Sequence, residues 1–116
     1  MKQTNRALGI FGEKKAVKFL KKHKYKILDT NFTCVLGEVD IVAKDGEYLV
    51  FIEVKTRTTA MFGLPKEAVD EQKQRKIILV ASYYQKVKRM LDTPVRFDVV
   101  QVLDGEIELI KGAFEL

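Results

Sequence analysis

Residues 47–56, EYLVFIEVKT, constrain the fold more than any other part of the chain. The run YLVFIEV is nearly continuous in apolar residues, as in a central strand whose two faces are both covered. It follows the strand-like residues 38–44 across Asp45-Gly46, a dipeptide that suits a two-residue type I′ turn. The sequence therefore predicts a hairpin at the centre of a covered sheet.

Helical and strand patterns elsewhere complete this core. Apolar residues at three- and four-residue intervals predict amphipathic helices from about 6 to 24 and from about 66 to 90, the second after a loop at 58–65. Further strands are predicted at 25–33, 95–103 and 106–112, with Asp104-Gly105 as the last turn. The order α-β-β-β-α-β-β predicts an α/β (α+β) fold, with a mixed central sheet of about five strands flanked by two main helices.

Composition indicates one domain with an anionic partner. A chain of 116 residues without internal repeats or low-complexity tracts is expected to form a single domain over residues 1–116. Its 21 lysines and arginines exceed its 16 aspartates and glutamates, and the excess gathers in residues 14–26, 71–76 and 86–89. Nucleic acid is one such partner, although solvated basic helix faces explain the same pattern.

The chain is expected to work in the cytoplasm and away from membranes. Cys34 is the single cysteine, so it forms no intrachain disulfide and has no companion for a metal or redox pair. No apolar run reaches the length of a signal peptide or a transmembrane helix.

Charged residues inside the predicted hairpin need an explanation. With Asp45-Gly46 as the turn, counting outward places Asp40 opposite Phe51 and Glu38 opposite Glu53, all on one face that also carries Lys55. The other face is wholly apolar, from Val39 and Ile41 to Val54. The count therefore predicts a cluster of carboxylates beside one lysine.

Clustered carboxylates require a neutralising partner. Two of them ~4 Å apart repel by about 4 kcal/mol at an effective dielectric near 20. A divalent metal between Asp40 and Glu53 would remove this repulsion, since Mg²⁺ and Mn²⁺ prefer carboxylate oxygens. Ordinary ion pairs on an exposed sheet face are the alternative, but the apolar surroundings favour a site.

Glu13 is a second anomaly, because it falls on the apolar arc of the first helix between Val17 and Leu20. An acid there points toward the sheet and adds a further carboxylate to the predicted cluster. A glutamate at the rim of the arc, paired with Lys14 or Lys18, remains the alternative.

Several motifs together resemble a known family. GEKKA, GEVDIVA, LVFIEVKTR, FGLPKEAV, a lysine at position 73 and RFDVV resemble the bacterial YraN-like family, which is related to Holliday-junction resolvases in the PD-(D/E)XK phosphodiesterase superfamily. The resemblance covers Gly12 to Val100 and implies a restriction-endonuclease-like core. The sequence departs from the wider pattern at Val39, which replaces a proline that carries no ligand atom, and at Thr33, where many relatives have an arginine.

By this resemblance Asp40 matches the superfamily aspartate, Glu53 and Lys55 match its E-x-K pair, and Glu13 matches the acid of its first helix. The implied reaction is metal-dependent phosphodiester hydrolysis of DNA by an endonuclease or exonuclease. Asp40, Glu53 and the Val54 carbonyl would hold Mg²⁺ or Mn²⁺, with Glu13 reaching it directly or through water. Lys55 would orient the attacking water or stabilise charge on the phosphate, and Glu38 is an accessory candidate.

Basic residues near this cluster are candidate phosphate contacts: Arg57, Lys73, Arg75 and Lys76. The resemblance admits branched and single-stranded DNA as substrates, and analogy with relatives admits a homodimer. Two alternatives stay open. One is a nucleic-acid-binding module that has a nuclease-like fold and little or no catalytic activity, and the other is a basic RNA- or ribosome-associated protein.

Overall fold

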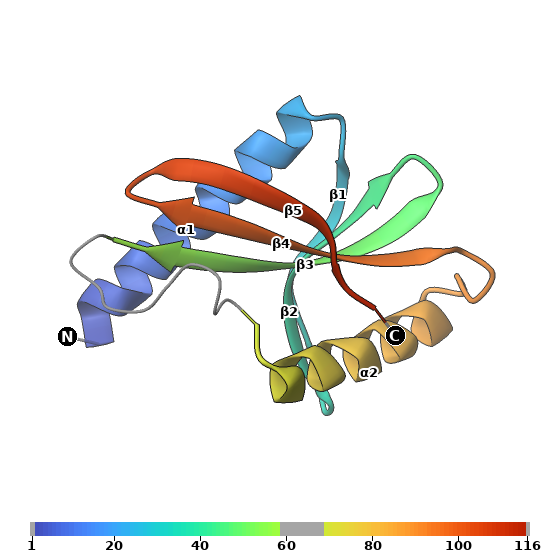
Figure 1. The fold of residues 1–116 in the computed structure, drawn as a ribbon. Helices are drawn as coiled ribbons and strands as arrows, with labels where there is room; N and C mark the ends of the chain where they lie inside the picture. Colours follow the sequence, from blue (N-terminus) through green and yellow to red (C-terminus); the bar gives the residue numbers. More distant parts are fainter. Residues whose placement is uncertain (1, 59–68, 116) are drawn as a thin grey trace.

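The computed structural model describes residues 2–58 and 69–115, which form two helices and five strands. Their order along the chain is the predicted α-β-β-β-α-β-β (Figure 1). The elements are α1 (Lys2–Lys22), β1 (Lys26–Cys34), β2 (Gly37–Asp45), β3 (Tyr48–Arg57), α2 (Glu71–Val87), β4 (Val95–Leu103) and β5 (Glu106–Phe114).

The strands form one mixed sheet in the order β1-β2-β3-β4-β5. Neighbouring strands are antiparallel except β3 and β4, which run parallel. A parallel pair requires a crossover connection, and α2 lies in the segment that joins these two strands. The predicted α+β fold with a mixed five-stranded sheet is therefore confirmed.

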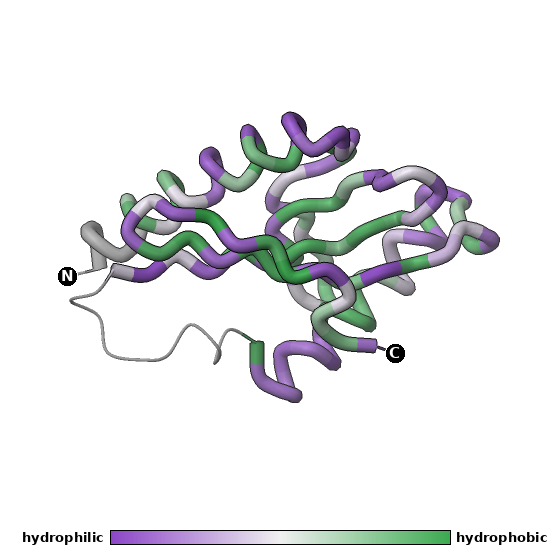
Figure 2. Tube along the Cα trace, turned by 45° about the horizontal axis from the view of Figure 1, so that its top comes forward, coloured by the Kyte–Doolittle hydropathy of each residue, from purple (hydrophilic) through white to green (hydrophobic). Residues whose placement is uncertain are grey.

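Each helix covers one face of the sheet. On one face Ala16 and Leu20 of α1 pack on alternate residues of the central strands, including Ile41 and Ile52. On the other face α2 packs on the intervening residues, including Phe51. Figure 2 shows hydrophobic residues along the central strands and hydrophilic residues at the end of α1 and the start of α2. None of the described helices combines the length and apolarity needed to cross a bilayer.

One residue departs from the predicted faces. Val39 was expected beside Ile41 and Ala43 but packs in the cluster under α2. The start of β2 runs along this helix, since a Cβ added at Gly37 would lie 3.4 Å from Val80. Strict alternation therefore ends near Asp40, where β2 leaves its pairing with β3.

The two Asp-Gly dipeptides behave differently. Asp104 and Gly105 both have positive φ and separate the paired residues Leu103 and Glu106, as predicted for a type I′ turn. The prediction for the first turn is wrong by one residue, because Asp45 pairs with Tyr48 and stays in β2.

Tertiary ion pairs explain this shift. Arg96 and Lys111 both contact Asp45 Oδ2, at 2.8 Å and 3.4 Å, and hold it in the strand. Gly46 then takes the first central position of the turn with a φ of 60°. The register moves by two, and Phe51 pairs with Val42 instead of Asp40. A shift of two preserves the side-chain alternation, so Asp40 and Glu53 still belong to the same predicted face.

Both helices differ from their predicted bounds. α2 was expected over 66–90, but Val69 and Asp70 are not helical, and Asp70 caps the helix by accepting a hydrogen bond from the Lys73 backbone N–H at 2.8 Å. The helix ends at Val87, just before Arg89 adopts a φ of 57°. The predicted start at 66 and the loop at 59–65 lie outside the described residues.

Helix α1 begins earlier than expected and ends at Lys22, just before Lys24, which has a left-handed backbone conformation.

A close approach of α1 to β3 depends on a glycine. A Cβ added at Gly12 would overlap the Thr56 side chain, so Gly12→Ala is expected to cost about 1 to 3 kcal/mol of unfolding free energy by forcing the helix away. Gly9 of the same helix has nothing within 4 Å of its added Cβ. Gly9→Ala is therefore expected to gain about 0.5 to 1 kcal/mol, and urea unfolding of both variants measures the contrast. Equal effects would contradict the predicted overlap.

Candidate active site

A surface hollow of about 280 Å³, termed the acidic hollow, brings together residues from both helices and the central strand pair. All four predicted catalytic residues line it, namely Glu13 of α1, Asp40 of β2, and Glu53 and Lys55 of β3. The remaining lining residues are Leu8, Gly9, Val54, Thr56 and Lys73. Residues far apart in the sequence therefore converge as the sequence predicted.

Asp40 lies just beyond the last backbone pair of strands β2 and β3, where a side-chain hydrogen bond connects the two strands. The paired stretch runs from Asp45–Tyr48 to Ile41–Ile52. One step further, Asp40 Oδ2 accepts a hydrogen bond from the Val54 backbone N–H at 2.8 Å. This bond fixes the carboxylate beside the E-x-K segment of β3 and satisfies a backbone donor at the point where the strands part.

Glu53 is the most buried carboxylate of the hollow, with a side-chain exposure of 4%. Burial, and after it the negative charge of Asp40, raise the pKa of Glu53 to about 7. The ammonium of Lys73 opposes this shift by contacting Glu53 Oε2 at 2.5 Å. Glu53 is therefore a desolvated acid whose proton equilibrium lies near neutral pH.

Glu13 and Lys55 are also shifted toward their neutral forms. Burial and then the charge of Asp40 raise the pKa of Glu13, although a hydrogen bond from Asn31 works against them. Burial and then the charge of Lys73 lower the pKa of Lys55, while Glu53 opposes that change. Three titratable groups perturbed within one hollow are typical of a functional site.

Lys73 behaves in the opposite way. Burial lowers the pKa of this lysine, but its hydrogen bond and ion pair with Glu53 outweigh burial, and the pKa is raised overall. The side chain is still 44% exposed, so it can leave Glu53 for solvent or for a ligand. The sequence predicted Lys73 as a phosphate contact and missed this ion pair, which depends on where α2 begins.

The remaining predicted site residues do not line the acidic hollow. Glu38 and Lys76 line a neighbouring hollow of about 420 Å³, together with Lys73. Arg75 is 77% exposed and lies 3.8 Å from Glu71 in the preceding turn. Arg57 ends β3, and its buried Nε has no hydrogen-bond partner among the described residues.

The acidic hollow fits a hard divalent cation with few protein ligands. No three described histidine, cysteine, aspartate or glutamate side chains are grouped as a metal cage. Mg²⁺ commonly needs only one or two carboxylates and keeps several waters, which agrees with the adjacent pair of Asp40 and Glu53. Burial and then the negative charge of Asp40 raise the pKa of Glu53, and a bound cation would offset the repulsion between the two carboxylates.

Comparison with known proteins identifies the family. The profile of the uncharacterised protein family UPF0102 matches residues 12–102, which include every lining residue of the acidic hollow except Leu8 and Gly9. The chain belongs to this family. A UPF0102 protein of Caldicellulosiruptor saccharolyticus is 50% identical over 94% of this chain and 98% of its own length. UPF0102 proteins of Geobacter metallireducens and Clostridium perfringens are 47% and 44% identical, and each match covers at least 95% of both chains.

These matches confirm the YraN-like resemblance across nearly the whole UPF0102 chain. They carry no description of an activity, since the family is named as uncharacterised.

Proposed function

We propose that the acidic hollow catalyses metal-dependent hydrolysis of DNA phosphodiester bonds. The observation that carries this proposal is the convergence of Asp40 and the buried Glu53 beside Lys55 in one open hollow. Such a set of charges would be costly if it served only the fold. The resemblance to PD-(D/E)XK enzymes supports the reaction class and admits both endonuclease and exonuclease action.

Each residue of the acidic hollow has a separate proposed role that follows from its position. Asp40, Glu53 and the Val54 carbonyl would hold Mg²⁺ or Mn²⁺, which supplies Lewis acidity to the phosphate and to water when bound. Lys55, whose pKa burial lowers, can orient the attacking water through a hydrogen bond. In its protonated form it stabilises the charge that develops on the phosphate. Glu13 approaches the same hollow from α1 and can orient a further water.

Basic groups beside the hollow suit a polyanionic substrate. The 44% exposed Lys73 and the 77% exposed Arg75 lie on the first turns of α2, followed by Lys76. Their contacts with the DNA backbone would give salt-dependent binding with little sequence preference.

A binding role without catalysis is the second candidate, and the Lys73–Glu53 ion pair favours it. This contact partly neutralises the acids with a cation of the chain itself. A nucleic-acid-binding module with a nuclease-like fold could keep such a pair without using a metal.

Cleavage of a DNA panel tests the proposal. Labelled branched, flapped, single-stranded and duplex DNA are incubated with the protein in Mg²⁺, Mn²⁺ or chelator. We expect cleavage that requires the metal and falls at least about a hundredfold in Asp40→Asn and Lys55→Ala, because each removes a ligand or a charge that acts in the transition state. Asp92→Asn removes an exposed carboxylate elsewhere and should retain full activity.

The same panel separates the two candidate functions. Failure to cut every substrate with either metal, or equal cleavage by Asp40→Asn and the wild type, would overturn the hydrolase. Persistent DNA binding without cleavage would support the binding module.

A further inference from the structure

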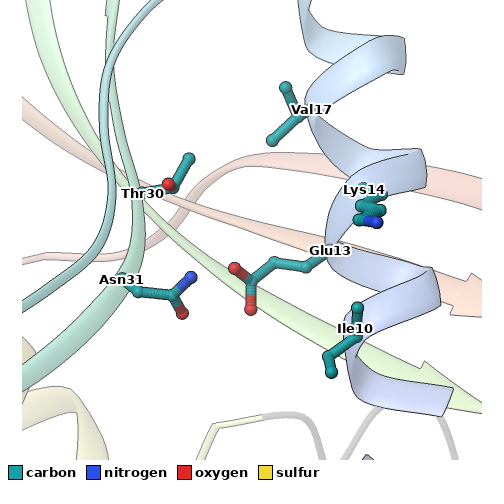
Figure 3. Close-up of a pocket in the computed structure, with 6 residues that line it drawn as sticks. All are labelled: Ile10, Glu13, Lys14, Val17, Thr30 and Asn31. Carbon is teal, nitrogen blue, oxygen red and sulfur yellow. The ribbon is translucent and has the colours of Figure 1, made fainter. Parts of the chain in front are cut away.

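A second hollow adjoins the acidic hollow between α1 and β1 (Figure 3). It has a volume of about 380 Å³ and is termed the α1–β1 hollow. Its lining residues are Ile10, Glu13, Lys14 and Val17 of α1 and Thr30 and Asn31 of β1. Volumes of this order accommodate small organic ligands.

Glu13 joins the two hollows, because it lines both of them. Figure 3 shows its carboxylate directed from α1 across the gap toward Asn31. Glu13 interacts with groups on both sides, since it lies within the field of the Asp40 charge and its side chain is hydrogen-bonded to Asn31. A ligand in the α1–β1 hollow would therefore lie directly beside the reacting groups.

The sheet register also places the two hollows next to each other. Thr30 pairs with Ile41 and Phe32 pairs with Val39, so Asn31 lies across from Asp40. Successive residues of a regular strand point to opposite faces, but Asn31 has a φ of 53°, and Thr30 and Asn31 both line the same hollow. This distortion of β1 presents two neighbouring polar groups to one ligand.

The lining of this hollow combines apolar and polar groups. Ile10 and Val17 lie on α1 on either side of Glu13, and Ile10 is 49% exposed. Thr30 and Asn31 provide a hydroxyl and an amide on the opposite wall, and Lys14 provides an ammonium group on the α1 side. A nucleobase has matching chemistry, with flat apolar faces, a polar edge and an adjoining phosphate.

We propose that the α1–β1 hollow binds an unpaired nucleoside next to the phosphate that the acidic hollow attacks. The proposal rests on the proposed function and adds a substrate class to it. Ile10 and Val17 pack on the base, Asn31 and Thr30 hydrogen-bond its edge, and Lys14 pairs with the neighbouring phosphate. A base in intact duplex is stacked and paired and cannot enter without being extruded. The hollow therefore selects single-stranded segments, flaps and the unpaired positions of branched DNA.

DNA binding in chelator tests this inference without depending on catalysis. Single-stranded and duplex oligonucleotides of the same sequence are titrated at one salt concentration with Ile10→Ala, Asn31→Gly and the double variant. Glycine keeps the left-handed backbone of position 31 available while removing the amide. We expect the double variant to lose about tenfold in affinity for the single strand and less than about twofold for the duplex.

A matched variant controls for the loss of exposed apolar surface. Leu79 of α2 is 51% exposed, close to the 49% of Ile10, so Leu79→Ala should leave both affinities unchanged. Thermal unfolding of all variants checks that these exposed substitutions preserve the fold. Equal losses for single strand and duplex, or no loss for either, would overturn the nucleoside site.

Parallel cleavage assays separate this inference from the proposed function. If the wild type cleaves DNA and the double variant keeps the wild-type preference for binding single strands, the nucleoside site is refuted and the proposed hydrolase is not. Selective loss of single-strand binding in a protein that cuts nothing would support the nucleoside site and refute the hydrolase. Absence of both effects would refute both.

Discussion

Replacing Glu53 by glutamine is expected to stabilise the protein by about 2 to 3 kcal/mol at pH 8 while abolishing DNA hydrolysis. The stabilisation follows from burial, which together with the charge of Asp40 raises the pKa of Glu53 to about 7 from the usual 4.5. Glutamine has nearly the same shape and carries no charge. It removes the cost of keeping an ionised carboxylate beside Asp40 in a desolvated position.

The pH dependence of this gain has a definite sign. Between pH 4.5 and about 7 the folded protein holds a proton on Glu53 that the unfolded chain has lost. Stability of the wild type therefore falls as pH rises through this window and stays low above it, as far as this residue contributes. The advantage of Glu53→Gln should be absent near pH 4.5, grow up to about pH 7 and then remain constant.

Urea unfolding in chelator at pH 4.5, 6 and 8 measures the difference in unfolding free energy between Glu53→Gln and the wild type. Glu38→Gln is the control, because Glu38 is an exposed acid near the start of the same hairpin. Adding Mn²⁺ should narrow the stability difference between variant and wild type at pH 8 by stabilising only the wild type, since the variant lacks one of the two proposed carboxylate ligands. A variant that is less stable than the wild type at pH 8 would show that the Lys73 ion pair outweighs burial. A carboxylate that costs stability where it stands is typical of a residue retained for function.

The convergence of the site was predictable because it depends on alternation more than on register. The predicted turn at Asp45-Gly46 was wrong by one residue, but the resulting shift of two left the alternation of the paired residues unchanged, and Asp40, Glu53 and Lys55 all line one hollow. A shift of one would have moved Asp40 to the opposite face. The two-residue side-chain periodicity of the strands therefore predicted this convergence correctly in spite of the error in the turn.

Long-range contacts account for what the sequence did not predict. Asp45 stays in β2 because Arg96 and Lys111 hold it there, and both of these residues come from strands more than fifty positions later in the chain. Lys73 reaches Glu53 because Asp70 caps α2 and fixes where its first turn lies. Local propensity does not reveal either contact, and the helical pattern extended the prediction over Val69 and Asp70, which precede the first residue of α2.

The close approach at Gly12 had a weak signal in the sequence. Glycine in a helix interior is unfavourable unless packing requires it, and Gly12 directly precedes Glu13. The structure supplies the reason, because Thr56 lies where a Cβ would be. The same contact that brings α1 against β3 brings Glu13 to the acidic hollow.

Removal of a second buried carboxylate should have the opposite effect from Glu53→Gln. Asp98 of β4 is fully buried, but four hydrogen bonds satisfy it. Arg96 donates to both carboxylate oxygens at 2.9 Å, the Tyr25 hydroxyl donates to Oδ2 at 2.9 Å, and the Gly112 backbone N–H donates to Oδ1 at 3.0 Å. The last bond spans the irregularity of the β4–β5 ladder between Phe97 and Val99.

Asp98→Ala is therefore expected to cost about 3 to 5 kcal/mol of unfolding free energy. It would leave the Arg96 guanidinium, which is 18% exposed, without its bidentate partner, and would also deprive the Tyr25 hydroxyl and the Gly112 N–H of their acceptor. Asp98 pairs in register with Ile52, the residue before Glu53, so this network also supports the strand that carries the acidic hollow.

Asp45→Asn is the matched control, because Asp45 is the other carboxylate of Arg96 and is 24% exposed. It should cost about 1 kcal/mol or less, since water and Asp98 still solvate the guanidinium. Urea unfolding at neutral pH compares the two variants with Asp98→Asn, which keeps the side-chain shape and should fall between them. Equal costs for Asp45→Asn and Asp98→Asn would contradict the role of burial. The expected contrast between Asp98 and Glu53 rests on one physical difference. Asp98 has donors for both of its oxygens, whereas Glu53 lies beside the carboxylate of Asp40 and has the partly exposed Lys73 as its ion-pair partner.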